Sequence, residues 1–305
     1  MRGGSDPWAD GLIGKELGGR YRLERVLGRG SFGVVFAGTH TWTERPVAVK
    51  VLQLALAASK PTMAKRFLRE AKAAAALRHK NVVDVLDMGE AEGTAFIALE
   101  LLNGEELSER LQRVGRFEVE EALQILLPVL DALHAAHERG MVHRDVKAEN
   151  IFLHDDEGEL VPKILDFGTV RTSYSDGETP LTEAGAILGT PHYMAPEQIT
   201  GNELTGAADV WSCGVLAFRM LSGQFPFDGR NATLVLANAF TKPAPKLGEV
   251  APHVPPGVAA AVDLALAKAP EARHKDMHAF MDALLDGARE VGLNVTDPRK
   301  RLTKP

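Results

Sequence analysis

The feature that most constrains this chain is the stretch HRDVKAEN at residues 143–150, followed by DFG at residues 166–168. Within one short span it places Asp145, which is suited to orienting a hydroxyl, and two oxygen ligands suited to Mg²⁺, Asn150 and Asp166. The order of the two stretches is typical of a phosphoryl-transfer site. The rest of the chain is therefore expected to supply the remaining parts of such a site.

Length and composition are consistent with a large, two-part fold. A chain of 305 residues with 45% hydrophobic residues can bury a substantial core, and it is long enough for two lobes. The net charge of −6 gives no indication of nucleic-acid binding. The single cysteine, Cys213, lies in an apolar run and excludes an intrachain disulfide framework, so we interpret it as a buried thiol in a reducing compartment.

No segment of the sequence has the pattern of a signal peptide or a membrane span. The first ten residues lack an apolar core, and the longest apolar helical pattern, at 122–137, carries Asp131, two histidines and a proline. We therefore expect a cytoplasmic location and no membrane segment. A piece cut from a membrane-anchored parent is the alternative.

The patterns along the chain predict two regions of different character. Residues 1–18 are Gly-rich and polar, which predicts a flexible lead-in. Short β-branched or alternating runs then predict five strands, at 21–27, 34–40, 46–52, 82–89 and 94–101, with an alanine-rich helix at 63–78. After residue 103 the patterns predict long helices at 118–138, 207–222 and 258–269.

These patterns predict an N-terminal lobe at 19–102 and a C-terminal lobe at 103–289, joined by a short Gly-containing hinge. Ligands usually bind in clefts, and a cleft between the lobes is the expected place here. Residues 290–305 are predicted to be a basic tail, and we interpret its part from Asp297 as a solvated charged segment, with a recognition patch as the alternative.

The segment GRGSFG at 28–33 is a glycine-rich loop whose backbone N–H groups can approach phosphates. Dinucleotide-binding folds share this spacing, but there the glycines open a helix, whereas Val34-Val35-Phe36 continues as a strand. We therefore predict a hairpin tip that covers a nucleotide through Leu27, Gly28, Gly30 and Gly33. On this motif alone, an ordinary mobile hairpin is the alternative.

The strand VAVK at 47–50 follows at the spacing such a site requires. Alternation along a strand sends Ala48 and Lys50 to one face, where a small side chain leaves room for adenine and the ammonium can reach the α- and β-phosphates. Such a lysine needs a carboxylate to hold it, and Glu70 on the following predicted helix is the candidate. An exposed lysine and a solvated glutamate are the alternatives.

The stretch at 143–150 then supplies the chemistry itself. Asp145 is predicted to orient the attacking hydroxyl, and Lys147 to neutralise charge on the transferred phosphoryl group. Asn150 and Asp166 are predicted to bind the metal ion. We interpret His143 as a packing residue beneath Phe167 rather than as an acid–base group.

With GTPHYMAPE at 189–197, residues 19–289 resemble a bacterial eukaryotic-type serine/threonine protein kinase domain. The resemblance implies an α+β, bilobal protein-kinase-like fold, with an antiparallel five-stranded N-lobe carrying one main helix and a mainly helical C-lobe. It also implies that Asp209 hydrogen-bonds the backbone of the catalytic loop and that Glu197 pairs with Arg273. Trp211 is then a core residue.

The resemblance extends to substrate and cofactors. Lys147 and Thr190 match the serine/threonine pattern, in which the threonine hydroxyl bridges the catalytic Asp and Lys. The expected cofactors are ATP and Mg²⁺, or Mn²⁺ in its place. The residues that would surround adenine are Leu99 as gatekeeper, Glu100 and Leu102 through their backbone groups, and Val35, Ala48 and Phe152 through apolar contact.

Regulation by phosphorylation is a further implication of the resemblance. Arg66, Arg144 and Arg171 fall where the family gathers cations around an activation-loop phosphate. Thr182 is the favoured acceptor and Thr179 the second, with a loop merely rich in Thr and Ser as the alternative. The expected partners are protein substrates with Ser/Thr acceptors and a second copy of the chain for trans-autophosphorylation, with no nucleic acid.

Two glutamates and one alanine bear on specificity and activity. Glu106 and Glu149 match positions that, in basophilic kinases, contact arginines of the substrate. Surface carboxylates, or a ribose contact for Glu106, are the alternatives. Ala74 stands where many kinases place a bulky residue against Phe167, so we expect a partner or dimer contact to seat the predicted helix at 63–78.

Two rival functions remain for a chain of this kind. A pseudokinase or signalling scaffold would be expected to have lost Lys50, Asp145, Asn150 or Asp166, and all four are present. A small-molecule kinase shares the fold but lacks the segment Ala195-Pro196-Glu197, which is also present.

Overall fold

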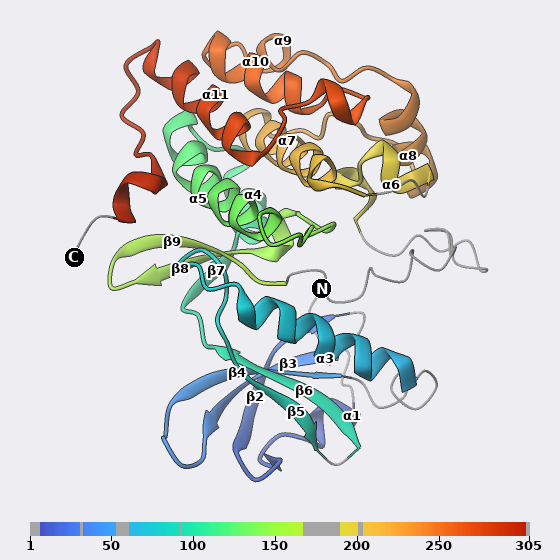
Figure 1. Ribbon diagram of the computed structural model, residues 1–305, viewed down its shortest axis with the longest axis vertical. Coiled ribbons are helices and arrows are strands. Elements are labelled where there is room, and N and C mark those ends of the chain that lie inside the picture. Colours follow the sequence, from blue (N-terminus) through green and yellow to red (C-terminus); the bar gives the residue numbers. More distant parts are fainter. Residues whose placement is uncertain are drawn as a thin grey trace. The chain divides into compact units, whose positions relative to one another are not determined.

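The structure is a computed structural model that describes residues 7–30, 33–52, 61–91, 93–166, 190–200 and 204–302. The chain divides into two compact units. The small unit holds the described residues up to 103 except 79–81, and the large unit holds 79–81 and the described residues from 104 onward. Figure 1 labels the helices and strands of both units.

The small unit is built on an antiparallel sheet with the strand order β1-β2-β3-β4-β6-β5. Its strands are β1 Glu16–Leu17, β2 Tyr21–Gly30, β3 Gly33–His40, β4 Pro46–Leu52, β5 Val85–Ala91 and β6 Thr94–Glu100. The five predicted strands are present, with boundaries shifted by up to three residues. The sheet has six strands rather than five because the short strand β1 pairs with the start of β2.

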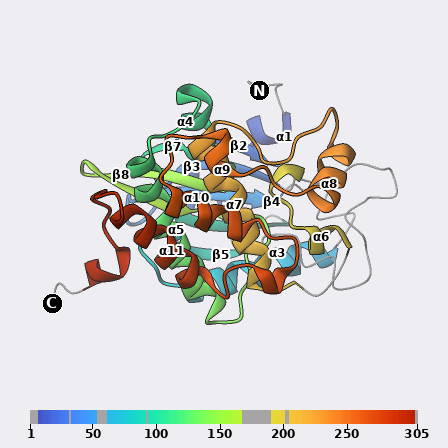
Figure 2. The ribbon, with the colours of Figure 1, turned by 90° about the horizontal axis from the view of Figure 1, so that it is seen from above.

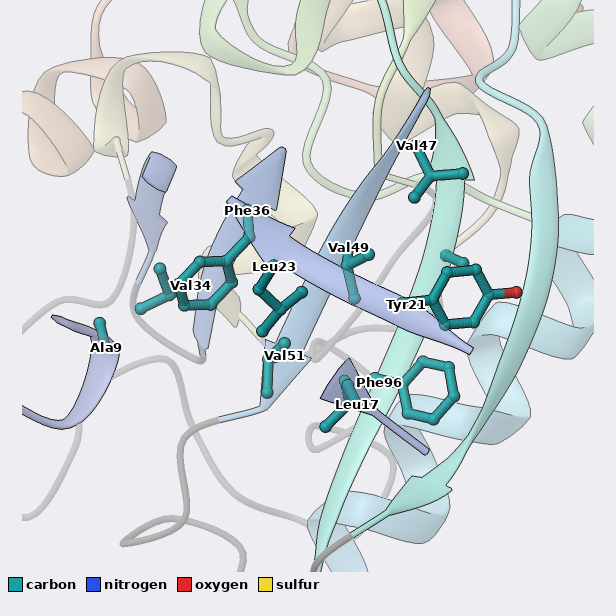
Figure 3. Packing of buried hydrophobic residues seen from close by; sticks show 11 residues of the cluster. Ala9, Leu17, Tyr21, Leu23, Val34, Phe36, Val47, Val49, Val51 and Phe96 are labelled. Atoms are coloured by element: carbon teal, nitrogen blue, oxygen red, sulfur yellow. The ribbon is translucent and has the colours of Figure 1, made fainter. Parts of the chain in front are cut away.

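The predicted flexible lead-in at 1–18 is wrong for the part that the structure describes. Residues Pro7–Asp10 form helix α1, and Ala9 and Leu17 are buried, with exposed fractions of 0% and 2%. Figure 3 shows Ala9 and Leu17 among the valines and aromatic rings that fill one face of the sheet. A few apolar side chains are enough to bind this segment to the sheet, although its Gly-rich composition suggested otherwise.

The other face of the sheet carries helix α3, Pro61–Ala76. Phe67 and Ala71 lie four residues apart on this helix and pack on Leu52, Ala95 and Ile97 of the sheet. This i, i+4 spacing is what turns an alanine-rich helix into one with an apolar stripe. The helix begins and ends two residues earlier than predicted.

The large unit is mainly helical, with a small sheet in the order β7-β8-β9. Its longest elements are α5 Val119–His137, α7 Gly206–Ser222 and α11 Met277–Arg289, and the shorter helices are α4 Leu107–Val114, α6 Pro196–Thr200, α8 Ala232–Thr241, α9 Leu247–Val250 and α10 Pro256–Ala265. The strands are β7 Gly104–Glu106, β8 Ile151–Asp156 and β9 Glu159–Ile164. Figures 1 and 2 show α7 enclosed by α5, α10 and α11.

Helix α7 is the centre of this unit because its sequence is apolar on almost every side. Its buried residues run almost without interruption from Ala208 to Leu221 and include Trp211 and Cys213, both 0% exposed. A helix that is apolar all round must be enclosed by other elements. The predictions that Trp211 is a core residue and Cys213 a buried thiol are confirmed.

Residues 79–81 belong to the large unit although they stand between α3 and β5 in the chain. The side-chain amide of Asn81 donates to the carbonyl of Pro162 at 2.7 Å, and the carbonyl of Asn81 accepts from the N–H of Ile164 at 2.9 Å. His79 lies 3.4 Å from the carboxylate of Asp131 on α5. These three residues are therefore fixed by contacts from distant parts of the sequence.

The predicted solvated tail from Asp297 is held to the large unit at Asp297, which is buried, and at Arg299. The guanidinium of Arg299 pairs with Asp297 at 2.8 Å and with Asp282 of α11 at 2.7 Å. The 3₁₀ helix Pro298–Leu302 that follows contacts α5. In the described part of the chain, no helix is both long enough and apolar enough to cross a membrane.

Candidate active site

In the small unit, strand β4 places the expected adenine and phosphate residues as alternation predicted. Val47, Val49 and Val51 enter the core shown in Figure 3, and Ala48 and Lys50 therefore project from the opposite face. In the sheet register, Val35 of β3 lies opposite Lys50, and Ala48 lies opposite Leu99 of β6. The sheet thus brings four of the predicted nucleotide-binding side chains together on neighbouring strands.

The glycine-rich segment is a β-hairpin, as the sequence predicted. Gly28 pairs with Val35 and Gly30 with Gly33 across β2 and β3, while residues 31–32 lie outside the described residues. A Cβ at Gly33 would collide with the carbonyl oxygen of Val51, so only glycine fits there. Because a strand and not a helix follows the glycines, the dinucleotide-binding alternative is excluded.

The carboxylate predicted to hold Lys50 belongs to Glu70. Glu70 falls on α3, but its side chain lies outside the described part, so the pairing stays a prediction. The same holds for Arg66 and for everything predicted at 167–189, including Phe167, Arg171, Thr179 and Thr182.

In the large unit, the loop between α5 and β8 gathers three of the predicted catalytic and metal-binding side chains. The Lys147 ammonium lies 2.8 Å from Oδ2 of Asp145. The amide of Asn150 donates to the Asp145 carbonyl at 2.8 Å and to its Oδ2 at 3.1 Å. Asp145 is 29% exposed at its side chain, so its carboxylate is oriented by two neighbours and still reachable from solvent.

Asp209, at the start of α7, supports this loop from the core. Its fully buried carboxylate accepts hydrogen bonds from the backbone N–H groups of His143 and Arg144 at 2.8 Å each, as the resemblance implied. It also contacts Nε2 of His137 at 2.8 Å. Burial raises the pKa of Asp209, but the hydrogen bond and charge of His137 outweigh it, and the pKa lies below its ordinary value.

The backbone at Arg144 shows why the loop needs such support. Its φ is +66°, a left-handed conformation that few residues other than glycine adopt. Strained residues of this kind persist where the surrounding contacts over-determine them, and Asp209 supplies one such contact here.

His143 is fully buried, and burial lowers the pKa of its imidazole. Both observations agree with its interpretation as a packing residue, since a buried imidazole stays neutral at physiological pH. Its predicted neighbour Phe167 lies outside the described residues.

His137 is a supporting residue that sequence reasoning missed. Its imidazole lies at the last turn of α5, and a Cβ at Gly206 would stand 2.6 Å from its Nδ1. The available signal was a histidine six residues before His143 combined with a glycine three residues before Asp209. Neither was recognised as half of a contact, because the two lie in different helices.

The implied pair between Glu197 and Arg273 is confirmed. Nη1 and Nη2 of Arg273 donate to the two carboxylate oxygens of Glu197 at 2.7 and 2.9 Å. The Arg273 side chain is 0% exposed, and its guanidinium lies 5.0 Å from the centre of the Trp211 ring. This pair anchors the short helix α6 to the core of the large unit.

The contacts of Thr190 and Phe152 do not test the roles predicted for them. The Thr190 hydroxyl lies 3.5 Å from Oε1 of Glu149, so its bridging role between Asp145 and Lys147 stays a prediction. Phe152 lies opposite Glu106 in the β7–β8 register. Glu106 accepts a hydrogen bond from Ser108, and burial raises the pKa of its carboxyl group.

The large unit offers oxygen ligands that suit Mg²⁺. The amide hydrogens of Asn150 are engaged by Asp145, which leaves its side-chain carbonyl oxygen as an acceptor. The carbonyl of Asn150 accepts from the N–H of Leu165 at 2.9 Å, so the next residue, Asp166, lies beside it. Among the described residues no three His, Cys, Asp or Glu side chains form a metal cluster.

Comparisons with known proteins place this arrangement in a family. The model of the family described as "Protein kinase domain" matches residues 21–289. The chain therefore belongs to the protein kinase domain family.

Relatives of known name agree. The chain is 39% identical over 277 residues to serine/threonine-protein kinase Pkn1 of Myxococcus xanthus, covering 90% of this chain and 39% of that protein. It is 38% identical over 277 residues to PknA of Mycobacterium tuberculosis, covering 89% and 62%. The chain thus spans about two fifths to three fifths of the length of these relatives.

A solved structure supports the same fold. The kinase domain of Mycobacterium tuberculosis PknI is 29% identical and matches with a TM-score of 0.69, over 90% of this chain and 98% of that chain. The expected bilobal α+β kinase fold is therefore confirmed, with the sixth strand β1 as an addition to the predicted sheet.

Proposed function

We propose that this chain is a serine/threonine protein kinase that transfers the γ-phosphate of ATP to hydroxyl groups of proteins in a signalling pathway. The observation that carries the proposal is the arrangement of Asp145, Lys147 and Asn150 around one carboxylate. The named relatives of this chain are serine/threonine protein kinases, which agrees with this proposal.

Asp145 and Lys147 have different roles: the first acts on the substrate hydroxyl and the second on the transferred phosphoryl group. The Asp145 carboxylate accepts a hydrogen bond from the substrate hydroxyl and directs the hydroxyl oxygen at the γ-phosphorus. It takes the proton as the new P–O bond forms and the bond from the γ-phosphorus to the departing ADP oxygen breaks. The Lys147 ammonium, 2.8 Å from Asp145, lies where it can offset negative charge on the transferred group. Positioning and charge neutralisation of this kind account for most of the catalysis in phosphoryl transfer.

The remaining residues hold the nucleotide. Lys50 binds the α- and β-phosphates, Gly28, Gly30 and Gly33 cover them, and Leu27, Val35, Ala48 and Phe152 enclose adenine, whose edge bonds to the backbone of Glu100 and Leu102. Glu70 holds Lys50, and Asn150 and Asp166 bind Mg²⁺ or Mn²⁺. When bound, ATP would supply the phosphoryl group and the metal ion would offset its negative charge. The buried free thiol of Cys213 fits a reducing, cytoplasmic location.

A preference for basic substrates fits two glutamates of the large unit. Oε2 of Glu149 is buried and has no hydrogen-bond partner among the residues that the structure describes. The pKa of the nearby Glu106 is raised, first by burial and then by the charges of Glu109 and Glu149. A guanidinium from a substrate would satisfy both carboxylates. Peptide arrays test this: Glu149→Gln and Glu106→Gln should each lose selectivity for upstream arginine, and an array that shows no arginine preference in the unaltered protein removes it.

Autophosphorylation of the activation loop is the proposed regulation, with Thr182 favoured and a second copy of the chain acting in trans. Mass spectrometry after incubation with ATP should find phosphate on Thr182, with Thr179 second. A fully active protein with no phosphate in this segment would refute this proposal.

The decisive experiment for the function is transfer of labelled phosphate. The chain is incubated with γ-labelled ATP, Mg²⁺ and a generic protein substrate, and the product is hydrolysed to identify the phosphoamino acid. Phosphoserine and phosphothreonine are expected, and Asp145→Asn should abolish transfer. Binding of ATP without transfer would favour a pseudokinase or scaffold, and transfer only to small molecules would favour the other rival.

A further inference from the structure

An aromatic platform with one cation lies beside the proposed acceptor site in the large unit. We define the Phe225 platform as His192, Tyr193, Phe225 and Arg219. The His192 and Phe225 rings are stacked with centroids 4.2 Å apart, and Tyr193 meets Phe225 edge-on at 5.5 Å. The Arg219 guanidinium lies 5.4 Å from the centre of the Phe225 ring.

The platform is joined directly to the catalytic loop. His192 and Tyr193 form the 3₁₀ helix that follows Thr190, and the Tyr193 side chain is hydrogen-bonded to the backbone of Ala148, next to Lys147. Two steps of 5.5 and 5.4 Å then lead from the Tyr193 ring through Phe225 to Arg219. The Arg219 guanidinium therefore lies no farther from the Tyr193 ring than about three extended residues of a peptide, at ~3.3–3.6 Å per residue.

Arg219 differs from Arg273 and Arg299, two other arginines of the unit that are not fully exposed. Arg273 and Arg299 are each neutralised by carboxylates at 2.9 Å or less. In the part of the chain that the structure describes, Arg219 contacts the Phe225 ring, and no carboxylate lies within ion-pair distance of its guanidinium. Its guanidinium lies near the C-terminal end of α7: a Cβ at the C-cap residue Gly223 would be 3.8 Å from Nη1 of Arg219.

A partly exposed guanidinium laid on an aromatic ring is a prepared anion site. The ring restricts the side chain and leaves its N–H donors to one side, so little entropy is lost when a carboxylate binds. The C-terminal end of a helix offers only carbonyl oxygens, which stabilise this charge but do not cancel it. In the other half of the platform a carboxylate is already present, since Nε2 of His192 lies 3.5 Å from Asp228.

We propose that Arg219 is a specificity-determining residue that binds an acidic side chain of the protein substrate within about three residues of the acceptor hydroxyl. The inference rests on the proposed kinase function and adds to it a second recognition point of opposite sign. Glu106 and Glu149 would accept a basic residue, and Arg219 would exclude one from its own position while accepting Asp or Glu. A substrate is then selected by the order of its charges and not by its net charge.

The test compares initial rates on acceptor peptides in which each position from −3 to +3 is in turn Asp, Glu, Ala or Arg. At one position the unaltered chain should prefer Asp or Glu over Ala by about 5- to 10-fold in kcat/KM, the range of a charge-assisted bond at a partly exposed site. Arg219→Ala should reduce this ratio to within 2-fold of one, and Arg219→Glu should reverse it in favour of Arg. Arg289→Ala, which removes an exposed arginine of α11, is the matched control.

Each outcome decides the matter. An unaltered chain with no acidic preference at any position overturns the proposal, as does a preference that survives in both Arg219→Ala and Arg219→Glu. Arg219→Lys keeps the charge and should keep part of the preference, which covers the case in which the other variants do not fold. A chain that phosphorylates no peptide at all contradicts the kinase function itself and is thereby distinguished from failure at Arg219.

Discussion

Removing Arg273 should destabilise the large unit more than any other single arginine substitution that the structure suggests. Its guanidinium donates five hydrogen bonds, two to Glu197 and one each to the carbonyls of Ala207, Ala267 and Lys268. Five is the full capacity of this side chain. Arg273→Ala therefore leaves three carbonyls without this donor and one buried carboxylate without its counter-ion.

The expected loss is about 3–5 kcal/mol, the range for breaking a buried ion pair from one side. For a unit of about 200 residues, ~2–4 °C per kcal/mol converts this to a fall in Tm of roughly 6–20 °C. Arg289→Ala is the control, because its partner Asp286 and Arg289 itself are 69% and 56% exposed. It should cost less than about 1 kcal/mol.

The assay is thermal unfolding followed by circular dichroism and by Trp211 fluorescence, since the Trp211 ring lies 5.0 Å from this guanidinium. A double-mutant cycle uses the single variants Arg273→Met and Glu197→Gln: the double variant should recover at least ~1 kcal/mol relative to the sum of these two losses, because it removes the stranded charge. Two results would contradict this role of Arg273: a free energy of unfolding for Arg273→Ala within about 1 kcal/mol of that of the unaltered chain, or single-variant losses that are simply additive in the double variant.

Three further results are expected. Asp209→Asn should lower kcat roughly 10- to 100-fold with little change in the KM for ATP, because ~1–3 kcal/mol of support for the strained loop is lost; an unchanged kcat would contradict this role. Burial raises the pKa of Asp131, but hydrogen bonds from His79 and His278 outweigh it and the pKa is lowered, so its stabilisation is present above the ordinary carboxyl pKa and lost as pH falls through the lowered value. The stability difference between the unaltered chain and Asp131→Asn should therefore shrink below about pH 4, and a difference independent of pH would argue against it. Burial, and then the charge of Arg273, lower the pKa of Lys268 to about 8. Arg273→Met should raise this pKa, as measured by NMR of ε-¹³C-labelled lysine, and no change would exclude the second cause.

The sequence predicted those features whose cause is local. Strand β4 begins and ends where the pattern placed it, because strict alternation around Val47, Val49 and Val51 leaves one choice of face. The catalytic loop was predicted because its residues lie within one short span and act on one another directly, as the contacts among Asp145, Lys147 and Asn150 show.

The features that were missed depend on distant partners. Residues 7–17 look like a flexible lead-in until the exposed face of the sheet, to which Ala9 and Leu17 bind, has formed. His137 and Arg299 carry no pattern of their own, and their roles follow only once Asp209 and Asp282 have been brought beside them. Position in space, which no short window of sequence contains, decides such cases.

The contact between Asn81 and Pro162 has a consequence for biosynthesis. The amide of Asn81 leaves the ribosome 81 residues before the carbonyl that it will bind. Until strand β9 has been synthesised, the turn between α3 and β5 cannot form this hydrogen bond. The first hundred residues alone therefore lack one of the contacts that hold the turn in place. A nascent chain halted before residue 162 should therefore be cut by proteases near this turn, and one halted well beyond it should resist.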